Sequence, residues 1–341
     1  MREHRRCRRI SAADVTAALA NLAGFLLSPF AIAADSRLYW LNFVVFIIAG
    51  AAVFWLRERR AGAEHSALAY IFPIRAWLSQ SSLVDFKVYV ANHFFSVKAT
   101  GIGLVSASFI ASKVAGAASP YIGGFIAGGG EFWSLAMCAL MVALANDLGT
   151  YITHRICHEH KALWPFHQLH HSAEVLTPLT VYRKHPIHDL LSSIIQPLIM
   201  GPVIGVLVVL FNHDGLWTIM GFNAVYMIFN FLGCNLRHSQ IWIGFGPVLS
   251  RIFISPAMHQ IHHSIDPKHY DRNYGEVLAM WDWMFGTLYI PKSREAITFG
   301  VTGEASTEAL SLHPTLKEAY LQPMREFASI VRRKNPASER A

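Results

Sequence analysis

The feature that most constrains this chain is a series of apolar runs, each about 20 residues long, which is the length that a helix needs to cross a hydrocarbon core of ~30 Å. Such runs occur at six places: residues 15–34, 38–56, 94–118, 132–152, 190–211 and 216–234. Charged residues make up only 15% of the chain, whereas about 25% is usual in soluble domains. We therefore predict an all-α integral membrane protein, a multi-pass bundle of about six transmembrane helices.

The first apolar run has two interpretations. Arginines precede it and it ends in Ala31-Ile-Ala-Ala34, which is similar to a secretory signal with its cleavage site. The run is longer than the apolar part of most signals, however, and a second run follows it directly and ends in Arg57-Glu-Arg-Arg60. A helical hairpin with both basic ends in the cytoplasm obeys the positive-inside rule, so we favour the hairpin. Residues 67–78 form a shorter apolar segment with Pro73, and we predict an interfacial or re-entrant helix there.

The orientation of the later spans follows from that hairpin. The third span leads out of the cytoplasm, the fourth leads back, and the fifth and sixth form another hairpin whose two ends are cytoplasmic. The net charge of +7 is explained by basic flanks that favour an anionic leaflet. No nucleic-acid motif accompanies these basic runs, so we expect no nucleic-acid partner.

Histidines gather in three clusters that follow or separate these spans. The clusters read HxxxH from residue 154, HxxHH from residue 167 and HxxHH from residue 259. Residues three or four apart lie on one side of a helix, and imidazole is a good ligand for iron, zinc and copper. Eight imidazoles exceed the four of one closed site, so we predict two neighbouring metal ions in a cytoplasmic, histidine-rich helical cap. The predicted ligands are His154, His158, His167, His170, His171, His259, His262 and His263.

Two further histidines are candidate ligands. His238 follows the sixth span in Asn235-Leu-Arg-His238, and His185 precedes the fifth span in Arg183-Lys-His185-Pro186. The remaining eight histidines lack the cluster spacing and receive no role. Neither the HExxH pattern of zinc proteases nor the repeated ExxH pattern of carboxylate di-iron bundles is present.

Other residues are predicted to support the metal site or to anchor the chain. Metal-bound imidazoles usually donate their second N–H to a carboxylate or a carbonyl, and Asp147, two helical turns before His154, and Asp282 are candidate partners. Trp164, Trp281 and Trp283 are expected to lie at the membrane interface.

The region after residue 297 is expected to be peripheral. Leu316, Tyr320, Phe327 and Val331 could share one face of a short helix, although Pro323 should interrupt it.

The residues around the clusters resemble one known family. Over residues 146–289, the three histidine boxes and the segments that flank them resemble the fatty acid hydroxylase/sterol desaturase superfamily, whose members are integral membrane oxygenases with two non-haem iron ions. The flanking segments are Asp147-Leu-Gly-Thr-Tyr-Ile-Thr-His-Arg155, Phe166-His-Gln-Leu-His-His-Ser172, Arg237-His-Ser239, Asn273-Tyr-Gly275 and Trp281-Asp-Trp-Met-Phe-Gly-Thr287. The closing segments are most similar to the alkylglycerol monooxygenase and bacterial sterol desaturase-like branch.

This resemblance implies a reaction, cofactors and partners. It implies two iron ions, O2 as co-substrate, and hydroxylation or desaturation of an unactivated C–H bond of a membrane lipid, which could be a sterol, fatty acyl chain, sphingolipid or ether lipid. No flavin or nicotinamide fingerprint is present, so an external electron donor is expected, either a cytochrome b5-like protein or a ferredoxin with its reductase. The expected organisation is N-terminal anchor helices over 1–140, a catalytic domain over 141–290 and a cytoplasmic tail over 291–341.

A membrane metal transporter or metal-binding protein would also explain many histidines. Transporters hold their ligands inside the spans, near the middle of the bilayer. The histidines here lie just beyond the predicted ends of the spans, and this position favours the enzyme.

Overall fold

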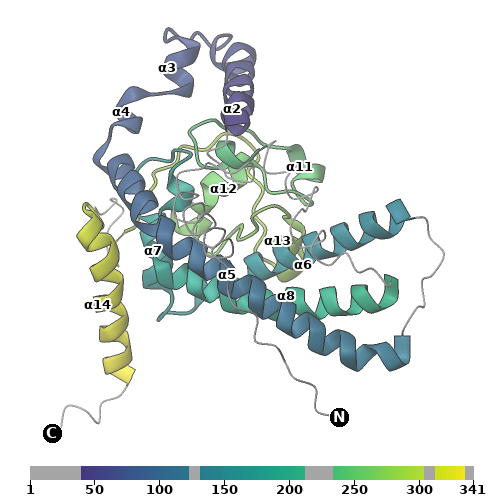
Figure 1. The fold of residues 1–341 in the computed structure, drawn as a ribbon. Coiled ribbons are helices and arrows are strands. Elements are labelled where there is room, and N and C mark those ends of the chain that lie inside the picture. The colour runs from purple at the N-terminus through teal and green to yellow at the C-terminus, as the bar shows by residue number, and fades with distance from the viewer. Residues whose placement is uncertain (1–39, 123–130, 212–232, 303–311, 335–341) are drawn as a thin grey trace, which may run out of the picture.

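The computed structural model describes residues 40–122, 131–211, 233–302 and 312–334 (Figure 1). Within these ranges the regular elements are helices, and the only β-type pairings are two isolated bridges, so the all-α prediction is confirmed for this part of the chain. The first predicted span and most of the sixth lie outside the described residues, as do both chain ends.

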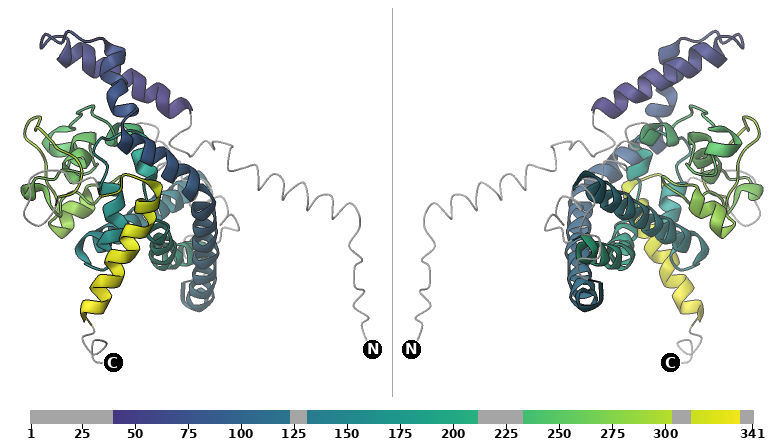
Figure 2. Two further views of the ribbon diagram at one scale, coloured as in Figure 1. Left: turned by 90° about the vertical axis from the view of Figure 1, so that its left-hand side faces the viewer. Right: turned by 90° about the vertical axis from the view of Figure 1, so that its right-hand side faces the viewer.

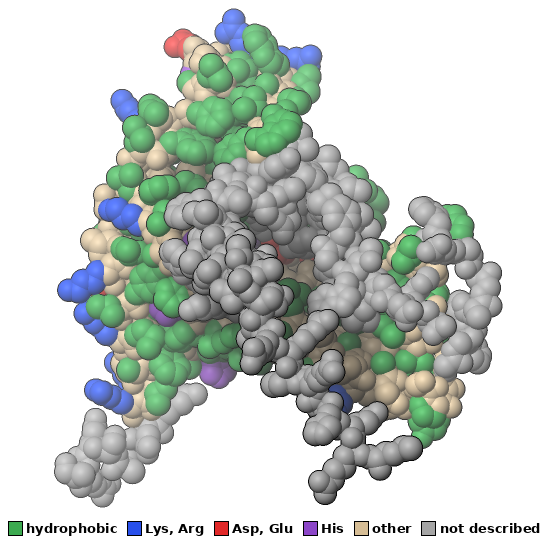
Figure 3. All heavy atoms as spheres, viewed as in Figure 1, with side chains coloured by type: hydrophobic (Ala, Val, Ile, Leu, Met, Phe, Trp, Pro, Cys, Tyr) green, Lys and Arg blue, Asp and Glu red, His purple; other side chains and the backbone are tan. Residues whose placement is uncertain are grey.

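Three long helices match the third, fourth and fifth predicted spans. They are α5 (Gln80–Ile122), α6 (Glu131–Glu159) and α8 (Pro186–Phe211). Residues 101–122, 133–159 and 186–211 of these helices are long and apolar enough to cross a membrane. Large apolar side chains such as Val105, which is 72% exposed, cover their outer faces (Figure 3). A hydrocarbon environment accounts for exposed apolar surface on this scale, because soluble proteins rarely carry such patches.

Two glycines bring α5 and α8 into close contact. A Cβ atom added at Gly201 would lie 2.7 Å from the Ile110 side chain, and one added at Gly205 would lie 2.6 Å from the Ala111 carbonyl oxygen. The spacing of the two glycines is the GxxxG pattern that lets membrane helices approach closely without a hydrophobic driving force between them. This contact sets the position of α8, whose first turn lies beside the histidine clusters.

The structure describes the second predicted span from residue 40 onward. Helix α2 (Trp40–Val53) continues into a π-helical turn, η2 (Phe54–Glu58), and this segment is not among the three helices that satisfy the length and hydropathy of a span. The predicted interfacial segment 67–78 forms two short helices, α3 (Ala67–Ile71) and α4 (Ile74–Trp77), which Pro73 separates. Leu68, Ile74 and Leu78 in this segment are exposed.

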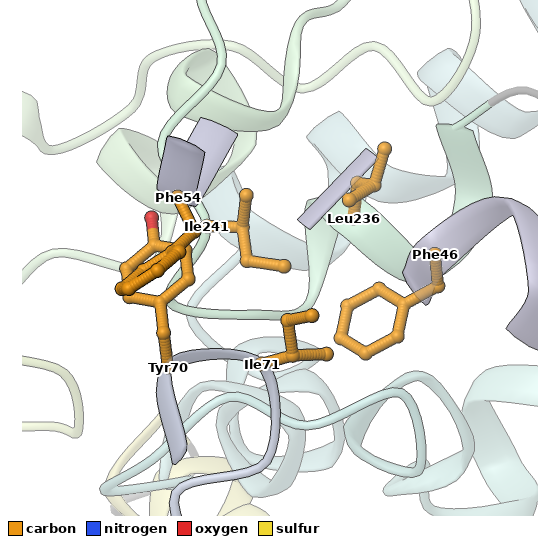
Figure 4. Packing of buried hydrophobic residues seen from close by; sticks show 6 residues of the cluster. All are labelled: Phe46, Phe54, Tyr70, Ile71, Leu236 and Ile241. Atoms are coloured by element: carbon orange, nitrogen blue, oxygen red, sulfur yellow. The ribbon is translucent and has the colours of Figure 1, made fainter. Parts of the chain in front are cut away.

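These N-terminal helices have a definite packing partner. Phe46, Phe54, Tyr70 and Ile71 form one buried cluster with two residues from much later in the chain, which are Leu236 and Ile241 (Figure 4). The side-chain amide of Gln240 donates to the carbonyl of Ile71 at 3.2 Å, and Arg57 donates to the carbonyl of Trp242 at 3.3 Å. Because His238 lies between Leu236 and Ile241, the N-terminal helices hold the backbone that carries this histidine.

Short helices form a cap at one end of α6 and α8 (Figures 1 and 2). They are α7 (Trp164–His171), η3 (Thr180–Tyr182), α11 (Gly246–Leu249), α12 (Pro256–His262), η4 (Pro267–His269) and α13 (Met280–Phe285). Local sequence explains why α12 begins where it does. Pro256 takes the first helical position, where no N–H is needed, and the hydroxyl of Ser255 accepts from the backbone N–H of Met258.

The C-terminal helix α14 (Leu316–Lys334) corrects one prediction. It runs without interruption through Pro323, whereas the sequence led us to expect a break at this proline. Leu316, Tyr320 and Phe327 do contact the body of the protein, whereas Val331, about one turn beyond Phe327, is 46% exposed.

The contact between α5 and α8 yields a testable prediction. Replacing Gly205 with alanine should lower the apparent Tm of the detergent-solubilised protein, because overpacking of a close contact costs roughly 1–3 kcal/mol. Gly116→Ala on α5 is the matched control, since its added Cβ meets no atom within 4 Å and alanine is the better helix former. Equal Tm values for the two variants in a thermal unfolding assay would contradict the close contact.

Candidate metal centre

Nine histidines converge at the end of α6 in two groups. The first group contains five histidines and the second contains four, and within each group the nearest ring nitrogens all lie within 4.8 Å of one another. The first group is His154, His158, His167, His171 and His262, and the second is His170, His238, His259 and His263. The structure thus brings together all eight histidines of the three boxes, and it adds His238 as the ninth.

Helix geometry divides each HxxHH box between the two groups. In α7 the i,i+4 pair His167 and His171 belongs to the first group, whereas His170, about 100° around the helix from His171, belongs to the second. The box in α12 is divided in the opposite sense, because His259 and His263 join the second group and His262 joins the first. Consecutive histidines in each box therefore face different groups, and this feature places the two groups side by side.

The contacts within the groups are made by Nε2 atoms. In the second group, Nε2 of His259 lies 3.0 Å from Nε2 of His238 and 3.3 Å from Nε2 of His263, and in the first group the Nε2 atoms of His167 and His171 are 3.2 Å apart. Two nitrogens bound to one metal ion at about 2.1 Å would lie roughly 3.0–3.4 Å apart, depending on whether the coordination angle is octahedral or tetrahedral. The observed separations fall in this range.

The second ring nitrogens show which nitrogen carries the proton. Nδ1 of His154 lies 2.7 Å from the carbonyl oxygen of Tyr274, Nδ1 of His170 lies 3.1 Å from that of Thr180, and Nδ1 of His262 lies 2.8 Å from that of Arg272. A carbonyl can only accept, so each Nδ1 must donate its N–H, and the opposite Nε2 of a neutral ring keeps its lone pair.

The protonation state of the cap histidines follows from burial. Removal from water lowers the pKa of His262 to about 4 and holds the pKa values of His170, His171, His259 and His263 well below the usual range of an imidazole. These rings are therefore neutral at pH 7. A metal ion needs this state of its ligands, because a protonated nitrogen has no lone pair to give.

Several Nε2 atoms that face the centre of the first group lack a hydrogen-bond partner. The Nε2 atoms of His154, His158 and His262 are buried and have no hydrogen-bond partner in the structure. In the second group the four Nε2 atoms lie in a row, and Nε2 of His170 keeps its lone pair because its Nδ1 donates to the carbonyl of Thr180. Buried polar groups are rarely left unsatisfied, so the donor set fits one cation in each group. Imidazole suits iron, zinc, copper and nickel, so the ligands alone do not select among these metals.

The loop after α12 positions two of the three carbonyls. Asp271 and Asn273 both have φ of 57°, in the left-handed region that asparagine and aspartate tolerate best. The side-chain amide of Asn273 donates to the carbonyls of Met258 at 3.0 Å and of Tyr289 at 2.8 Å, and it accepts from the N–H of Tyr289 at 2.7 Å. These bonds hold the loop so that the carbonyls of residues 272 and 274 reach His262 and His154.

The structure places Asp147 and Asp282 differently from the prediction. Both carboxylates accept hydrogen bonds from the segment that follows the loop, and not from a histidine of the two groups. Asp282 accepts from the N–H groups of Tyr274 and Gly275, each at 2.8 Å, and Asp147 accepts from the N–H of Val277 at 3.1 Å and from the indole of Trp281 at 3.0 Å. Asp282 thus supports His154 through the backbone of Tyr274, and Asp147 holds the same segment a few residues further on. Helical spacing placed Asp147 on the face of His154, but it could not show that this backbone segment lies between the carboxylate and the ring.

A buried ion pair supports the second box, and the sequence did not point to it. Arg183 is 2% exposed, and its guanidinium lies 3.0 Å from a carboxylate oxygen of Asp85 on α5. The same guanidinium donates to the carbonyl of Leu169 at 2.9 Å and to the hydroxyl of Ser172 at 2.9 Å, so it satisfies the C-terminal end of α7. Thr180, whose carbonyl accepts from His170, donates its hydroxyl to Asp85 at 2.7 Å.

His185, the other candidate ligand, lies outside both groups. Its Nε2 lies 3.3 Å from the carbonyl oxygen of Tyr320 on α14, and its Nδ1 accepts from the N–H of Ile187 at 3.2 Å. The structure thus gives His185 a role in joining α8 to α14. His188, which received no role from its spacing, is buried and stacks on the ring of His167 with the ring centres 5.0 Å apart.

The three tryptophans predicted at the interface have different surroundings. Trp283 is 61% exposed, but Trp281 is buried and donates to Asp147. Trp164 packs against the rings of His158 and His171 at centroid distances of 5.0 and 5.5 Å. Trp281 therefore supports the loop beside the histidine groups and does not lie at the interface as predicted, whereas Trp164 is half-buried against the first histidine group.

Comparison with known proteins finds a matching family model for the central part of the chain. Residues 139–287 match the family model described as fatty acid hydroxylase, and this range contains all nine histidines of the two groups. This match agrees with the resemblance that the motifs predicted. No solved structure gives a significant match.

Curated relatives include lipid hydroxylases and a sterol desaturase. The chain is 32% identical over 174 residues to the ornithine lipid hydroxylase OlsE of Rhizobium tropici, covering 51% of this chain and 48% of the relative. It is 32% identical over 178 residues to the alkylglycerol monooxygenase of Danio rerio, covering 51% and 35%. It is 28% identical over 162 residues to the Delta(7)-sterol 5(6)-desaturase of Eremothecium gossypii, covering 46% and 39%. The chain thus spans about half the length of these relatives, or less.

The loop around Asn273 yields a testable prediction. Asn273→Ala should raise the rate of amide hydrogen exchange over residues 271–278 at least tenfold, because it removes three side-chain hydrogen bonds and a residue that tolerates the left-handed conformation. Asn273→Gly keeps the backbone freedom and loses only the amide, so it should show a smaller increase. Glu159→Gln, at an exposed salt bridge on α6, serves as the control. Exchange at the wild-type rate in Asn273→Ala would show that the amide does not hold the loop.

Proposed function

We propose that this protein is an O2-dependent oxidoreductase that hydroxylates an unactivated C–H bond of a membrane lipid and uses two iron ions. The observation that carries the proposal is the convergence of nine histidines, seven of them buried, into two adjoining groups with their Nε2 atoms turned inward. The fatty acid hydroxylase domain and the lipid hydroxylases among the relatives support the reaction class. Desaturation is the related outcome, since a sterol desaturase is also similar.

The two groups would hold one iron ion each. When bound, a pair of iron ions supplies the redox chemistry that activates O2 for attack on a C–H bond. The proposed ligands are the five histidines of the first group for one ion and the four of the second group for the other. All nine proposed ligands are neutral, so no carboxylate among them offsets the positive charge of the metal ions. Burial favours the unprotonated form of the rings, and the coordinating nitrogens therefore keep their lone pairs.

The protein residues around the groups exclude water and fix the rings. The backbone carbonyls of residues 180, 272 and 274 hold the tautomer and orientation of three ligands, as the outer hydrogen bonds of metal-bound imidazoles usually do. Seven of the nine histidines are buried, and only His154 and His158 on α6 keep partial exposure. We propose that the lipid chain approaches the centre from this edge, beside the end of a membrane-spanning helix.

The membrane helices support a lipid substrate. Helices α6 and α8 are both long and apolar enough to span a bilayer, and both meet the histidine cap at one end. We propose that this end faces the cytoplasm, in accordance with the basic flanks of the first two apolar runs. An electron donor, either a cytochrome b5-like protein or a ferredoxin with its reductase, would reach the centre from that side.

Catalysis explains the histidines better than metal transport does. A transported ion must enter and leave its site, whereas these rings are buried and locked by backbone carbonyls and by the buried Arg183–Asp85 pair. The histidines also lie at the end of α6 and not near the middle of a span, where transporters hold their substrates.

Metal analysis tests the proposed ligand set. The wild-type protein, purified after expression in iron-supplemented cells, should contain about two iron ions per chain. His158→Ala and His238→Ala should each lower the content to roughly one, because each variant removes a ligand from a different group. His185→Ala should keep both ions, since His185 bonds to Tyr320 and Ile187 outside the groups. Elemental analysis with a wild-type metal content in His238→Ala would exclude His238 as a ligand.

Lipid analysis tests the reaction itself. Membranes of cells that express the wild-type protein under 18O2 should contain a lipid 18 mass units heavier than its precursor, whereas cells under 16O2 should give a lipid 16 units heavier. The difference of two units marks an oxygen atom inserted from O2. His170→Ala and His262→Ala should abolish this product, because each removes one ligand from one group. Loss of two hydrogens without oxygen insertion would identify desaturation in place of hydroxylation. Full oxidation by either variant would refute the proposed centre.

A further inference from the structure

Helix α14 has a packed apolar face and, beside it, a row of apolar residues that are largely exposed. On the packed face, Ala319 is fully buried with Leu169 of α7 and Val84 and Val88 of α5, and Phe327 contacts the ring of Phe166 at a centroid distance of 5.4 Å. Beside this face lie Leu321, Met324, Ala328 and Val331, which we call the α14 stripe. Its three large members are 40%, 44% and 46% exposed in chain order.

The spacing of the α14 stripe makes it continuous. Its members are separated by three, four and three residues, so they lie within a narrow arc of the helix over about three turns. Isolated apolar residues on a surface need no explanation, but an exposed row at helical spacing marks a surface that meets an apolar environment.

Basic residues border this stripe. Helix α14 contains five basic residues and two acidic residues. By helical position, Arg325 and Arg332 lie along one edge of the stripe, and Arg333 and Lys334 follow at the end of the helix. Arg325 lies 3.3 Å from Glu318, but this pair is largely exposed and such pairs contribute little. Figure 3 shows Lys and Arg side chains along the side of the molecule where α14 lies.

The direction of α14 also points to a membrane surface. Figures 1 and 2 show that α14 runs across the direction of α8 and not along it, at the end of α8 where the cap lies. If α8 crosses the bilayer, as its length and hydropathy allow, α14 runs along the plane of the leaflet.

We propose that α14 binds the surface of an anionic lipid leaflet. The α14 stripe would enter the boundary between headgroups and acyl chains, while Arg325 and Arg332 bind lipid phosphates, as in-plane amphipathic helices do. A lipid surface fits these features better than an acidic protein partner does, because the apolar row and its basic edge lie along a helix oriented in the membrane plane. The packed face of α14 contacts α7, so a bound leaflet would hold α14 against the helix that carries the second histidine box.

The test uses the full chain in lipid nanodiscs with a nitroxide spin label on α14. Ala328→Cys places the label on the stripe, and Ser329→Cys places it on the next exposed residue, about 100° around the helix. Cys7→Ser removes one competing thiol, and the thiols of Cys138, Cys157 and Cys234 are buried. In discs that contain phosphatidylglycerol, the label at position 328 should be accessible to O2 and shielded from an aqueous nickel reagent. The label at position 329 should stay accessible to the nickel reagent.

Charge and apolar variants separate the two contributions. In the Ala328→Cys background, Arg325→Gln and Arg332→Gln should each lower the ratio of lipid-immersed to aqueous label about fivefold, as expected for one basic residue at an anionic surface. Leu321→Glu should abolish the immersed component, while the iron content stays at the wild-type value and shows that the centre is intact.

Three results would overturn the proposal. They are equal nickel accessibility of the two labels, equal immersion in discs of neutral phosphatidylcholine, and shielding in detergent that grows with protein concentration. The last result would identify a second copy of the chain as the occupant of the stripe.

Discussion

The cost of burying imidazole nitrogens without partners is the constraint on which this structure depends. Nine rings direct their Nε2 atoms into a region from which water is excluded, and this arrangement is stable only if the rings are neutral and the nitrogens find an acceptor of their lone pairs. The surrounding structure meets the first condition by burial and by directing Nδ1 protons to backbone carbonyls. A metal ion in each group would meet the second.

The support for these rings comes from separate parts of the chain. The loop at Asn273 and the carboxylates of Asp147 and Asp282 hold the carbonyl that His154 needs, while Arg183 and Asp85 hold the end of α7 and, through Thr180, the ring of His170. The N-terminal helices pack around Leu236 and Ile241 and thereby hold His238. Each histidine box therefore has its own buried support outside the box.

Much of this could be predicted from residue spacing, because helical periodicity and apolar length are local properties. The helix from Glu131 runs unbroken into His158, and the eight box histidines converge as their spacing indicates. Tertiary relations could not be predicted in this way. The split of each HxxHH box depends on where the facing helix lies, the role of Asp147 runs through a backbone segment 130 residues away, and only packing distinguishes His238 from His185. The prediction of a break at Pro323 was wrong for a similar reason, because the packing of α14 on its neighbours outweighs the loss of one backbone hydrogen bond.

The sharing of each box between the two groups has a consequence for biosynthesis. The first group requires residues from 154 to 262, and the second requires residues from 170 to 263, so a ribosome must complete α12 before either group has all its ligands. The two sets of ligands become complete within one residue of each other. A nascent chain therefore cannot complete one histidine group long before the other, and a metal ion could find a full set of ligands in either group only after the chain has been synthesised through residue 262.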